Sequence, residues 1–202
     1  MTFLGTILEE LLQIFRREGI NANSDAELIR KLDIRATTFH ELFANRDDMV
    51  IQVVHYDIKQ QKLEQAKLLE KATNPVEEIM MLLVDGIEKM KQINPVYITD
   101  LQQFPEAWQA SIEHVTSNNQ IVNAEILNRG ILEGYFRKDL NLQLVTKIIL
   151  EQFFMLINPV VFPPHKYSLS EVFRSIYFYY IRGICTEAGG KQAEEFFAKN
   201  NV

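Results

Sequence analysis

The sequence predicts an all-α fold of about nine or ten helices, and two features carry this expectation. Apolar residues recur every three or four positions along most of the chain, which is the spacing of an amphipathic helix. Capping signals separate these stretches, because Ser or Asn precedes several of them and Pro follows at the first helical position of two. The signals are Ser24 with Glu27, Asn45, Asn74-Pro75, Asn94-Pro95 and Asn141. At 202 residues and 47% apolar, the chain can bury a sizeable core.

The opening stretch from Thr2 to Glu18 predicts an amphipathic helix. Its apolar stripe consists of Phe3, Ile7, Leu11, Ile14 and Phe15, with charged residues off the stripe. Gly19 follows, and glycine is the usual residue where a helix ends in a left-handed conformation.

The next stretch, residues 24–46, predicts two short helices joined by a tight turn. Ser24 and Glu27 form a capping box at the first helix, and Asp33-Ile34 is a turn of minimal length. The second helix runs from about Arg35 to Phe43. Its expected buried side is Phe39, Leu42 and Phe43, which leaves Arg35, Ala36, Thr37, Thr38, His40 and Glu41 facing outward. This pattern is typical of a helix-turn-helix whose second helix enters the major groove of DNA. The alternative is an ordinary helix pair with a polar outer face.

The remaining helices follow from the capping signals. They are expected over residues 46–72, 75–92, 95–102, 105–133, 141–157 and 168–186, the last opened by a second capping box of Ser168 with Glu171. A short, loosely docked final helix is expected after Gly189-Gly190. The last two long helices, 141–157 and 168–186, are apolar on more than one side, with Ile176 and Tyr180 among the expected exposed positions. A second apolar face needs a partner, so the sequence predicts a homodimer formed by these two helices as a four-helix bundle.

No catalytic constellation is found. His40-Glu41 begins the metalloprotease motif H-E-x-x-H, but Ala44 stands where the second histidine ligand would be. The sequence therefore predicts no enzyme, no metal and no cofactor. The lone Cys185, the lack of a signal peptide and the lack of a long apolar run favour the cytoplasm, with no membrane partner.

The chain resembles the TetR family of one-component transcriptional regulators. The residues that match the family's first helix, of the type ILxAAxxLFxxxG, are Ile7-Leu8, Ile14-Phe15 and Gly19. Those that match the later signature LYxxFxxKxxL are Thr38-Phe39-His40, Phe43 and Asn45-Arg46-Asp47-Asp48-Met49. Residues 130–137 resemble the segment G-x-x-x-G-x-F-R that ends the family's seventh helix. The family's usual turn Gly, capping Ser or Thr and Tyr are replaced here by Asp33, Arg35 and His40.

The resemblance implies a ligand-responsive DNA-binding regulator, a repressor released from its operator by a small apolar or aromatic effector. The DNA-binding domain is then residues 1–48, and the ligand-binding and dimerisation domain is residues 49–202. The residues expected to contact double-stranded DNA, at a palindromic operator, are Lys31, Arg35, Ala36, Thr37, Thr38, His40 and Arg46. Those expected to line the effector site are Phe104, Trp108, His114, Asn118, Asn119, Phe153 and Phe154.

Two alternatives remain open for the effector site and two for the function. The aromatic residues also fit a plain core, and Asn119 also fits a hydrogen bond between helices. The net charge is −6, and residues 1–58 carry six basic against ten acidic side chains. Because phosphate contacts supply much of the affinity for DNA, the same fold could have lost specific DNA binding and act as a small-molecule or protein-binding module. An enzyme built on a helical bundle is the third hypothesis.

Overall fold

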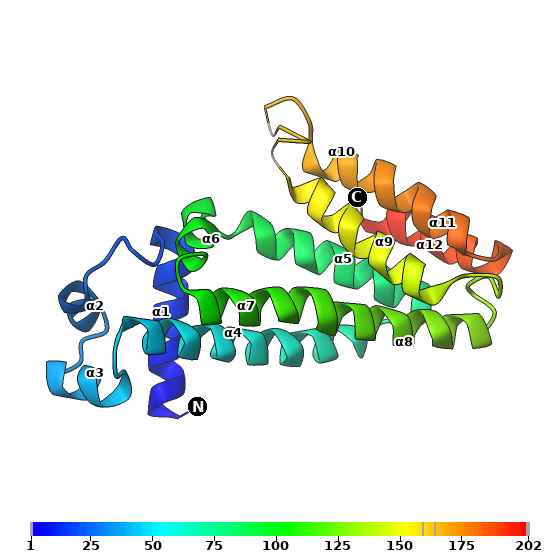
Figure 1. Cartoon of the computed structure of the whole chain (residues 1–202). Coiled ribbons are helices and arrows are strands. Elements are labelled where there is room, and N and C mark those ends of the chain that lie inside the picture. The colour runs from blue at the N-terminus through cyan, green and yellow to red at the C-terminus, as the bar shows by residue number, and fades with distance from the viewer. Residues whose placement is uncertain (1, 159, 164, 201–202) are drawn as a thin grey trace. The chain divides into compact units, whose positions relative to one another are not determined.

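The computed structural model describes residues 2–158, 160–163 and 165–200, and the fold is all-α over these residues, as predicted (Figure 1). The helices in chain order are α1 Phe3–Glu18, α2 Asp25–Lys31, α3 Ala36–Leu42, α4 Arg46–Leu69, α5 Pro75–Lys91, α6 Pro95–Leu101, α7 Pro105–Glu113, α8 Asn119–Leu132, α9 Leu142–Ile157, α10 Leu169–Phe173, α11 Tyr179–Ile184 and α12 Glu187–Asn200. Among the helices of these residues, none combines the length and the hydrophobicity that a membrane-spanning segment needs.

Two of these helices continue into the next through a π-helical turn. The turn η1, His114–Asn118, joins α7 to α8, and the turn η2, Arg174–Phe178, joins α10 to α11. The single helices predicted over 105–133 and 168–186 are therefore present, each with one π-helical interruption. A π-turn inserts an extra residue, so it rotates the side chains that follow it relative to those before it.

The helices form two compact units. Unit 1 contains Met1–Gln65 and Lys89–Val115, and unit 2 contains Ala66–Glu88 and Thr116–Val202. Each unit has its own cluster of buried apolar residues. Three helical rods, α4, α5 and α7–η1–α8, contribute residues to both units.

Helix α6 is joined to the end of α1 within unit 1. The last carbonyl groups of a helix have no hydrogen-bond donor inside the helix. At the end of α1, Asn94 donates to two of them. Its backbone N–H donates to the Arg16 oxygen at 2.9 Å, and its side-chain amide donates to the Arg17 oxygen at 3.0 Å. At the other end of α6, the Asp100 carboxylate accepts from the Asn21 N–H at 2.8 Å. Gly19, with φ +96°, lets the chain pass so close to α6 that a Cβ there would lie 2.9 Å from Val96 and Asp100.

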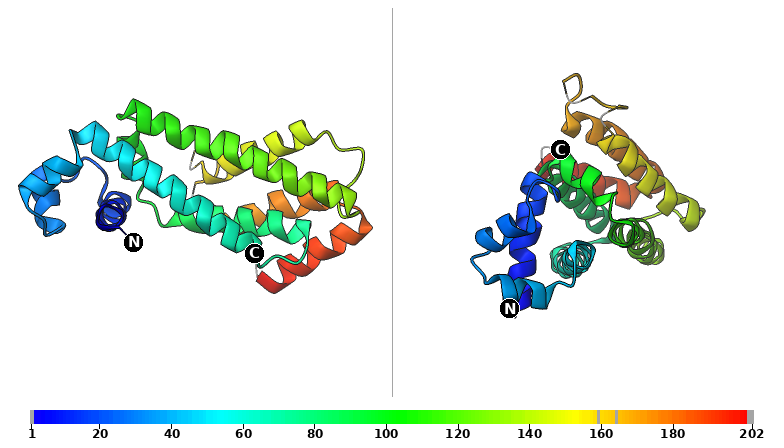
Figure 2. Two further views of the ribbon diagram at one scale, coloured as in Figure 1. Left: turned by 90° about the horizontal axis from the view of Figure 1, so that it is seen from below. Right: turned by 60° about the vertical axis from the view of Figure 1, so that its left-hand side comes forward.

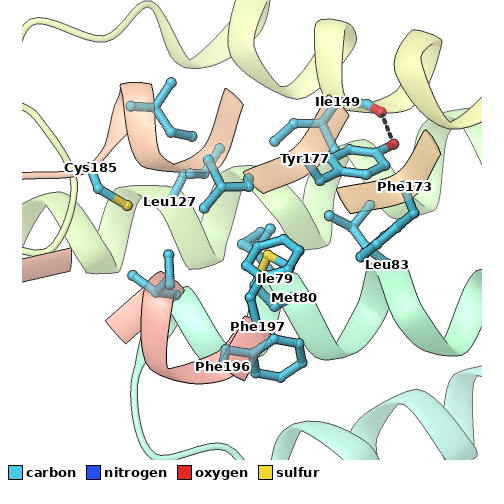
Figure 3. Packing of buried hydrophobic residues seen from close by; sticks show 14 of the residues in the cluster. Ile79, Met80, Leu83, Leu127, Ile149, Phe173, Tyr177, Cys185, Phe196 and Phe197 are labelled. Atoms are coloured by element: carbon cyan, nitrogen blue, oxygen red, sulfur yellow. Dashed lines mark hydrogen bonds between the residues drawn. The ribbon is translucent and has the colours of Figure 1, made fainter. Parts of the chain in front are cut away.

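The core of unit 2 is built around the buried ring of Tyr177 (Figure 3). Tyr177 contacts Phe173, with ring centroids 5.1 Å apart, and its hydroxyl donates to the Ile149 oxygen at 3.0 Å. This bond satisfies a hydroxyl buried in a largely apolar cluster, as burial of a phenol requires. It also links the α10–α11 rod to α9, which lies beside it in Figures 1 and 2.

Three sequence predictions are wrong in this unit. The final helix is not loosely docked, because α12 begins at Glu187, includes both glycines and buries Ala193, Phe196 and Phe197 in the core. The capping box at Ser168 is absent, because its hydroxyl accepts no hydrogen bond from the first turn of α10. Ile176 and Tyr180 are also not fully exposed; both pack against the core, while Tyr179 is 70% exposed.

Two adjacent glycines of α12 test this docking. A Cβ on Gly189 would overlap the backbone oxygen of Tyr135, whereas the nearest atom to a Cβ on Gly190 is Arg182 Cγ at 3.9 Å. We expect Gly189→Ala to lower the free energy of unfolding by about 2 kcal/mol through overpacking. Gly190→Ala is the control, and it is expected to be neutral or to stabilise by up to about 1 kcal/mol because alanine favours a helix. Urea denaturation measures both, and equal effects would contradict the close approach.

Candidate functional site

The predicted capping box opens α2 as expected. The Glu27 N–H donates to the Ser24 hydroxyl at 3.4 Å, and the Ser24 N–H donates to the Glu27 carboxylate at 2.8 Å. This backbone hydrogen bond, with a second from the Ser24 hydroxyl, holds the pKa of Glu27 below its usual value. Two otherwise unpaired amide groups of the first turn are thereby satisfied, which fixes where α2 begins.

The turn between α2 and α3 is tight because Asp33 adopts a left-handed conformation, with φ 51°. Asp is one of the few residues besides Gly that tolerates this region. The Ile34 N–H donates back to the Ile29 oxygen at 3.3 Å, so the chain reverses within a few residues. Leu28 and Leu32, which precede the turn, are buried and anchor it to the core of unit 1.

Helix α3 presents the side chains that the sequence predicts. Phe39 and Phe43 are buried and meet edge to face, with ring centroids 5.2 Å apart. On the other side, Arg35, Ala36, Thr37 and His40 are exposed and Thr38 is half-buried. A guanidinium, two hydroxyls and an imidazole on one short helix form a surface that can donate and accept hydrogen bonds at base edges.

Lys31 has an internal partner that the sequence analysis did not predict. Its ammonium contacts the Glu18 carboxylate, which also accepts from Asn23 and Arg17. Hydrogen bonds from these three side chains, Lys31 first, lower the pKa of Glu18 to about 2. Glu18 is therefore ionised throughout the neutral range, and it forms an ion pair with Lys31.

Arg46 also has an internal role. Its guanidinium donates to Asp25 Oδ1 at 2.6 Å, to the Asn23 oxygen at 2.9 Å and to the oxygen of Ile20. These bonds tie the first turn of α4 to the segment that precedes α2. Bonds to a charged donor are stronger than neutral ones, so this contact fixes the helix-turn-helix on α4.

Few cations on the helix-turn-helix remain without an ion pair. Among the residues that the structure describes, Arg30 and Arg35 are exposed and form none. Exposed acids near them in sequence include Glu27, Asp33 and Glu41. The surface around α3 can therefore attract a phosphate close to Arg30 or Arg35, but the described residues give it no extended positive charge.

The residues predicted to line an effector site divide between the two units. Phe104 and Trp108 pack with the core of unit 1. This is what the alternative of a plain core predicts for these two residues. In unit 2, Phe153 packs against the core beside Gly86 and meets Phe154 edge to face at 6.3 Å. Asn118 and Asn119 are half-buried where η1 meets α8. The effector site itself stays a prediction.

His114 begins the π-turn η1 and has an open ring nitrogen. Its Nδ1 is buried and has no hydrogen-bond partner among the described residues. Burial, and to a smaller extent Lys62, lowers the pKa of His114, so the imidazole is neutral at physiological pH. A neutral imidazole with one open nitrogen can orient a polar group of a ligand, and π-turns often occur at such sites.

Gln152 on α9 was missed by the sequence analysis. Its side-chain oxygen is buried without a partner within the described part of unit 2, and it directly precedes Phe153. A buried unpaired amide oxygen needs a donor, from a water or a ligand. Sequence offered no signal, since a glutamine within a helix is ordinary.

No metal site is found in residues 2–158, 160–163 and 165–200, where no three His, Cys, Asp or Glu side chains are placed to hold an ion. His40, the histidine of the incomplete H-E-x-x-H motif, is exposed on α3.

Comparison with known proteins identifies relatives but no matching family model. The HTH-type transcriptional repressor KstR2 of Mycobacterium tuberculosis is 24% identical over 149 residues, which cover 72% of this chain and 74% of KstR2. The solved structure of that ketosteroid transcriptional regulator covers 92% of this chain and 96% of its own, with 20% identity and a TM-score of 0.58.

Two further solved structures are similar over nearly the whole chain. A TetR-family regulator from Cytophaga hutchinsonii covers 91% of this chain and 95% of its own, with 15% identity and a TM-score of 0.73. The regulator FadR of Bacillus subtilis, solved with stearoyl-CoA, covers 91% of this chain and 100% of its own, with 16% identity and a TM-score of 0.68. At these identities the likeness establishes the fold.

The buried thiol of Cys185 gives a test of reactivity. Burial raises the pKa of Cys185 to about 12, so only about one thiol in ten thousand is ionised at pH 8. We expect almost no reaction with Ellman's reagent in the native state and one thiol per chain after unfolding in guanidinium chloride. A Lys138→Cys variant, at an exposed position, is the control and reacts at once. Rapid labelling of native wild-type protein would contradict the burial.

Proposed function

We propose that this chain, which has the fold of the TetR-family transcriptional regulators, is a DNA-binding repressor that a small apolar or aromatic effector releases from its operator. The observation that carries the proposal is the outward surface of α3. Arg35, Thr37 and His40 are exposed there, on a helix-turn-helix fixed by a capping box and by Arg46. The chain is then a regulator in the cytoplasm and not an enzyme.

In this proposal α3 enters the major groove. Arg35, Ala36, Thr37, Thr38 and His40 contact bases and nearby phosphates. Lys31 and Arg46 mainly stabilise the protein fold, because each already binds a carboxylate of the protein. The remaining N–H groups of these two residues are available to a phosphate at the edge of the groove.

The operator is palindromic because the protein acts as a homodimer. Helix α9 carries an outward apolar stripe at helical spacing, formed by Leu144, Ile148 and Met155 and interrupted by Glu151. Tyr179, on the neighbouring rod, is exposed as well. We assign this face to a two-fold contact with a second copy, which places two α3 helices at half-sites about 34–36 Å apart or a multiple of that distance.

The effector binds in the domain that follows residue 48, and the DNA contacts lie within residues 1–48. FadR was solved with a long-chain acyl thioester and KstR2 is a ketosteroid regulator, so an effector with a large apolar part is favoured. Phe153 and Phe154 supply apolar surface, and His114, Asn118 and Asn119 supply polar groups. Phe104 and Trp108, the other two residues predicted for this site, pack with the core of unit 1.

Effector binding reaches the DNA contacts through continuous helices. Each of the rods α4, α5 and α7–η1–α8 contributes to both units. An effector that favours one placement of these rods changes the spacing of the two α3 helices. By linkage, operator DNA and effector must weaken each other's binding by the same factor.

The second candidate function is a binding module that no longer reads DNA. The observation in its favour is the acidic N-terminal part, where residues 1–58 carry six basic and ten acidic side chains. Such a protein would bind no duplex more tightly than any other.

Selection of genomic fragments by the purified full-length protein tests the function. We expect one fragment to be enriched, and we expect Thr38→Ala with His40→Ala to weaken its binding about tenfold or more, since one good base contact is worth about 1–3 kcal/mol. The matched control is Thr99→Ala with His55→Ala, which removes the same groups from exposed sites elsewhere in unit 1. Equal affinity of the two double variants would count against α3 as the reading helix.

Sedimentation at micromolar concentration tests the dimer. Ile148 is 42% exposed, so a charge there does not disturb the core of one chain but places a carboxylate in the proposed interface. We expect Ile148→Glu to give a folded monomer while the wild type is a dimer. Gln143→Glu, which adds the same charge off the stripe of α9, is the control. A monomeric wild type would refute the interface.

A further inference from the structure

Unit 1 contains a basic pocket that the proposed function does not use. It lies between the last turn of α1 and the junction of α5 with α6, which are neighbours in Figure 1, and its volume is about 490 Å³. The residues that line this basic pocket are Gln13, Arg16, Arg17, Lys89, Lys91, Gln92, Ile93, Asn94 and Pro95. The volume falls in the range of small-molecule sites.

The lining has one sign of charge, although the chain as a whole is acidic. Four of its side chains are cationic, and no Asp or Glu is among its described lining residues. Carboxylates outside the lining pair with cations of the pocket, among them Asp57 with Arg16, Glu18 with Arg17 and Glu64 with Lys89. A concave surface lined by cations raises the local concentration of anions.

Two guanidinium groups give the pocket hydrogen-bonding capacity as well as charge. Arg16 is held by Asp57 through Nη2 at 2.7 Å, and its Nε is buried without an acceptor among the described residues. A buried N–H of a charged group without an acceptor is costly, so an acceptor from a ligand is expected beside it. The Arg17 side chain is 70% exposed, and among the described residues it pairs with its sequence neighbour Glu18 at 2.8 Å. Exposed ion pairs of this kind are weak, so Arg17 can turn to another anion.

We propose that the basic pocket binds a small phosphate-bearing molecule. Phosphate matches the forked geometry of guanidinium groups, and its multiple charge suits a lining with two arginines and two lysines. The amide side chains of Gln13 and Gln92 add neutral donors and acceptors, and Ile93 and Pro95 give an apolar wall for the organic part of the molecule. The ligand is a free phosphate ester rather than a phosphate of the DNA backbone, because the site is a pocket and lies at the end of α1 that meets α6, not on α3.

Titration calorimetry of the full-length protein with inorganic pyrophosphate tests this site. We expect one pyrophosphate bound per chain with a Kd below about 1 mM at low salt. In the variant Arg17→Gln with Lys91→Gln, binding falls at least about tenfold, because two charge-assisted hydrogen bonds are lost. The control variant, Lys138→Gln with Lys147→Gln, removes the same charge from exposed positions of unit 2 and keeps the wild-type Kd. Circular dichroism and thermal melting of both variants establish that they fold.

Three outcomes would overturn the proposal. They are no saturable binding by the wild type, equal weakening in both variants, and unchanged pyrophosphate binding in Arg17→Gln with Lys91→Gln together with a shallower salt dependence of duplex binding. The last outcome would assign these cations to the DNA backbone. Since the titration contains no DNA, its result is independent of whether the chain reads an operator.

Discussion

The helix-turn-helix depends on one guanidinium group. Arg46, at the start of α4, binds Asp25 and the backbone oxygens of Ile20 and Asn23. Short helices of seven residues are not stable by themselves, so α2 and α3 need fixed points outside their own hydrogen bonds. Arg46 provides one, the buried Phe39 and Phe43 provide another, and together they hold the exposed side of α3 in one orientation on the long helix α4.

Under the proposed function, the same internal pairing determines how this acidic chain would bind DNA. Lys31 and Arg46 stabilise the fold of the reading surface, so they add little charge to it. Arg30 on α2 and Arg35 at the start of α3 remain exposed, and neither forms an ion pair among the described residues. A surface with few free cations binds random DNA weakly, and its affinity comes largely from contacts at base edges. The weak electrostatic attraction that argues against DNA binding therefore favours selectivity.

Sequence predicted the features that depend on neighbouring residues. The caps at Ser24, Asn74, Asn94 and Asn141 lie where the pattern placed them. It could not predict partners far apart in the chain, such as Asp57 for Arg16 or Glu18 for Lys31. The two π-turns and the burial of α12 were also out of reach, since an inserted residue or a close approach at Gly189 leaves no periodic signal. For the same reason the basic pocket, assembled from α1 and the α5–α6 junction, could not be foreseen.

The salt dependence of binding to a selected genomic duplex, compared with a shuffled duplex of the same composition, tests the account most directly. With Arg30 and Arg35 of two chains as the free cations, the logarithm of the association constant should fall against the logarithm of salt concentration with a slope near −4. The selected duplex should keep a preference of about a hundredfold or more at every salt concentration. Equal affinity for the two duplexes, or a slope of about −8 or steeper, would contradict reading by α3 and indicate binding through bulk charge.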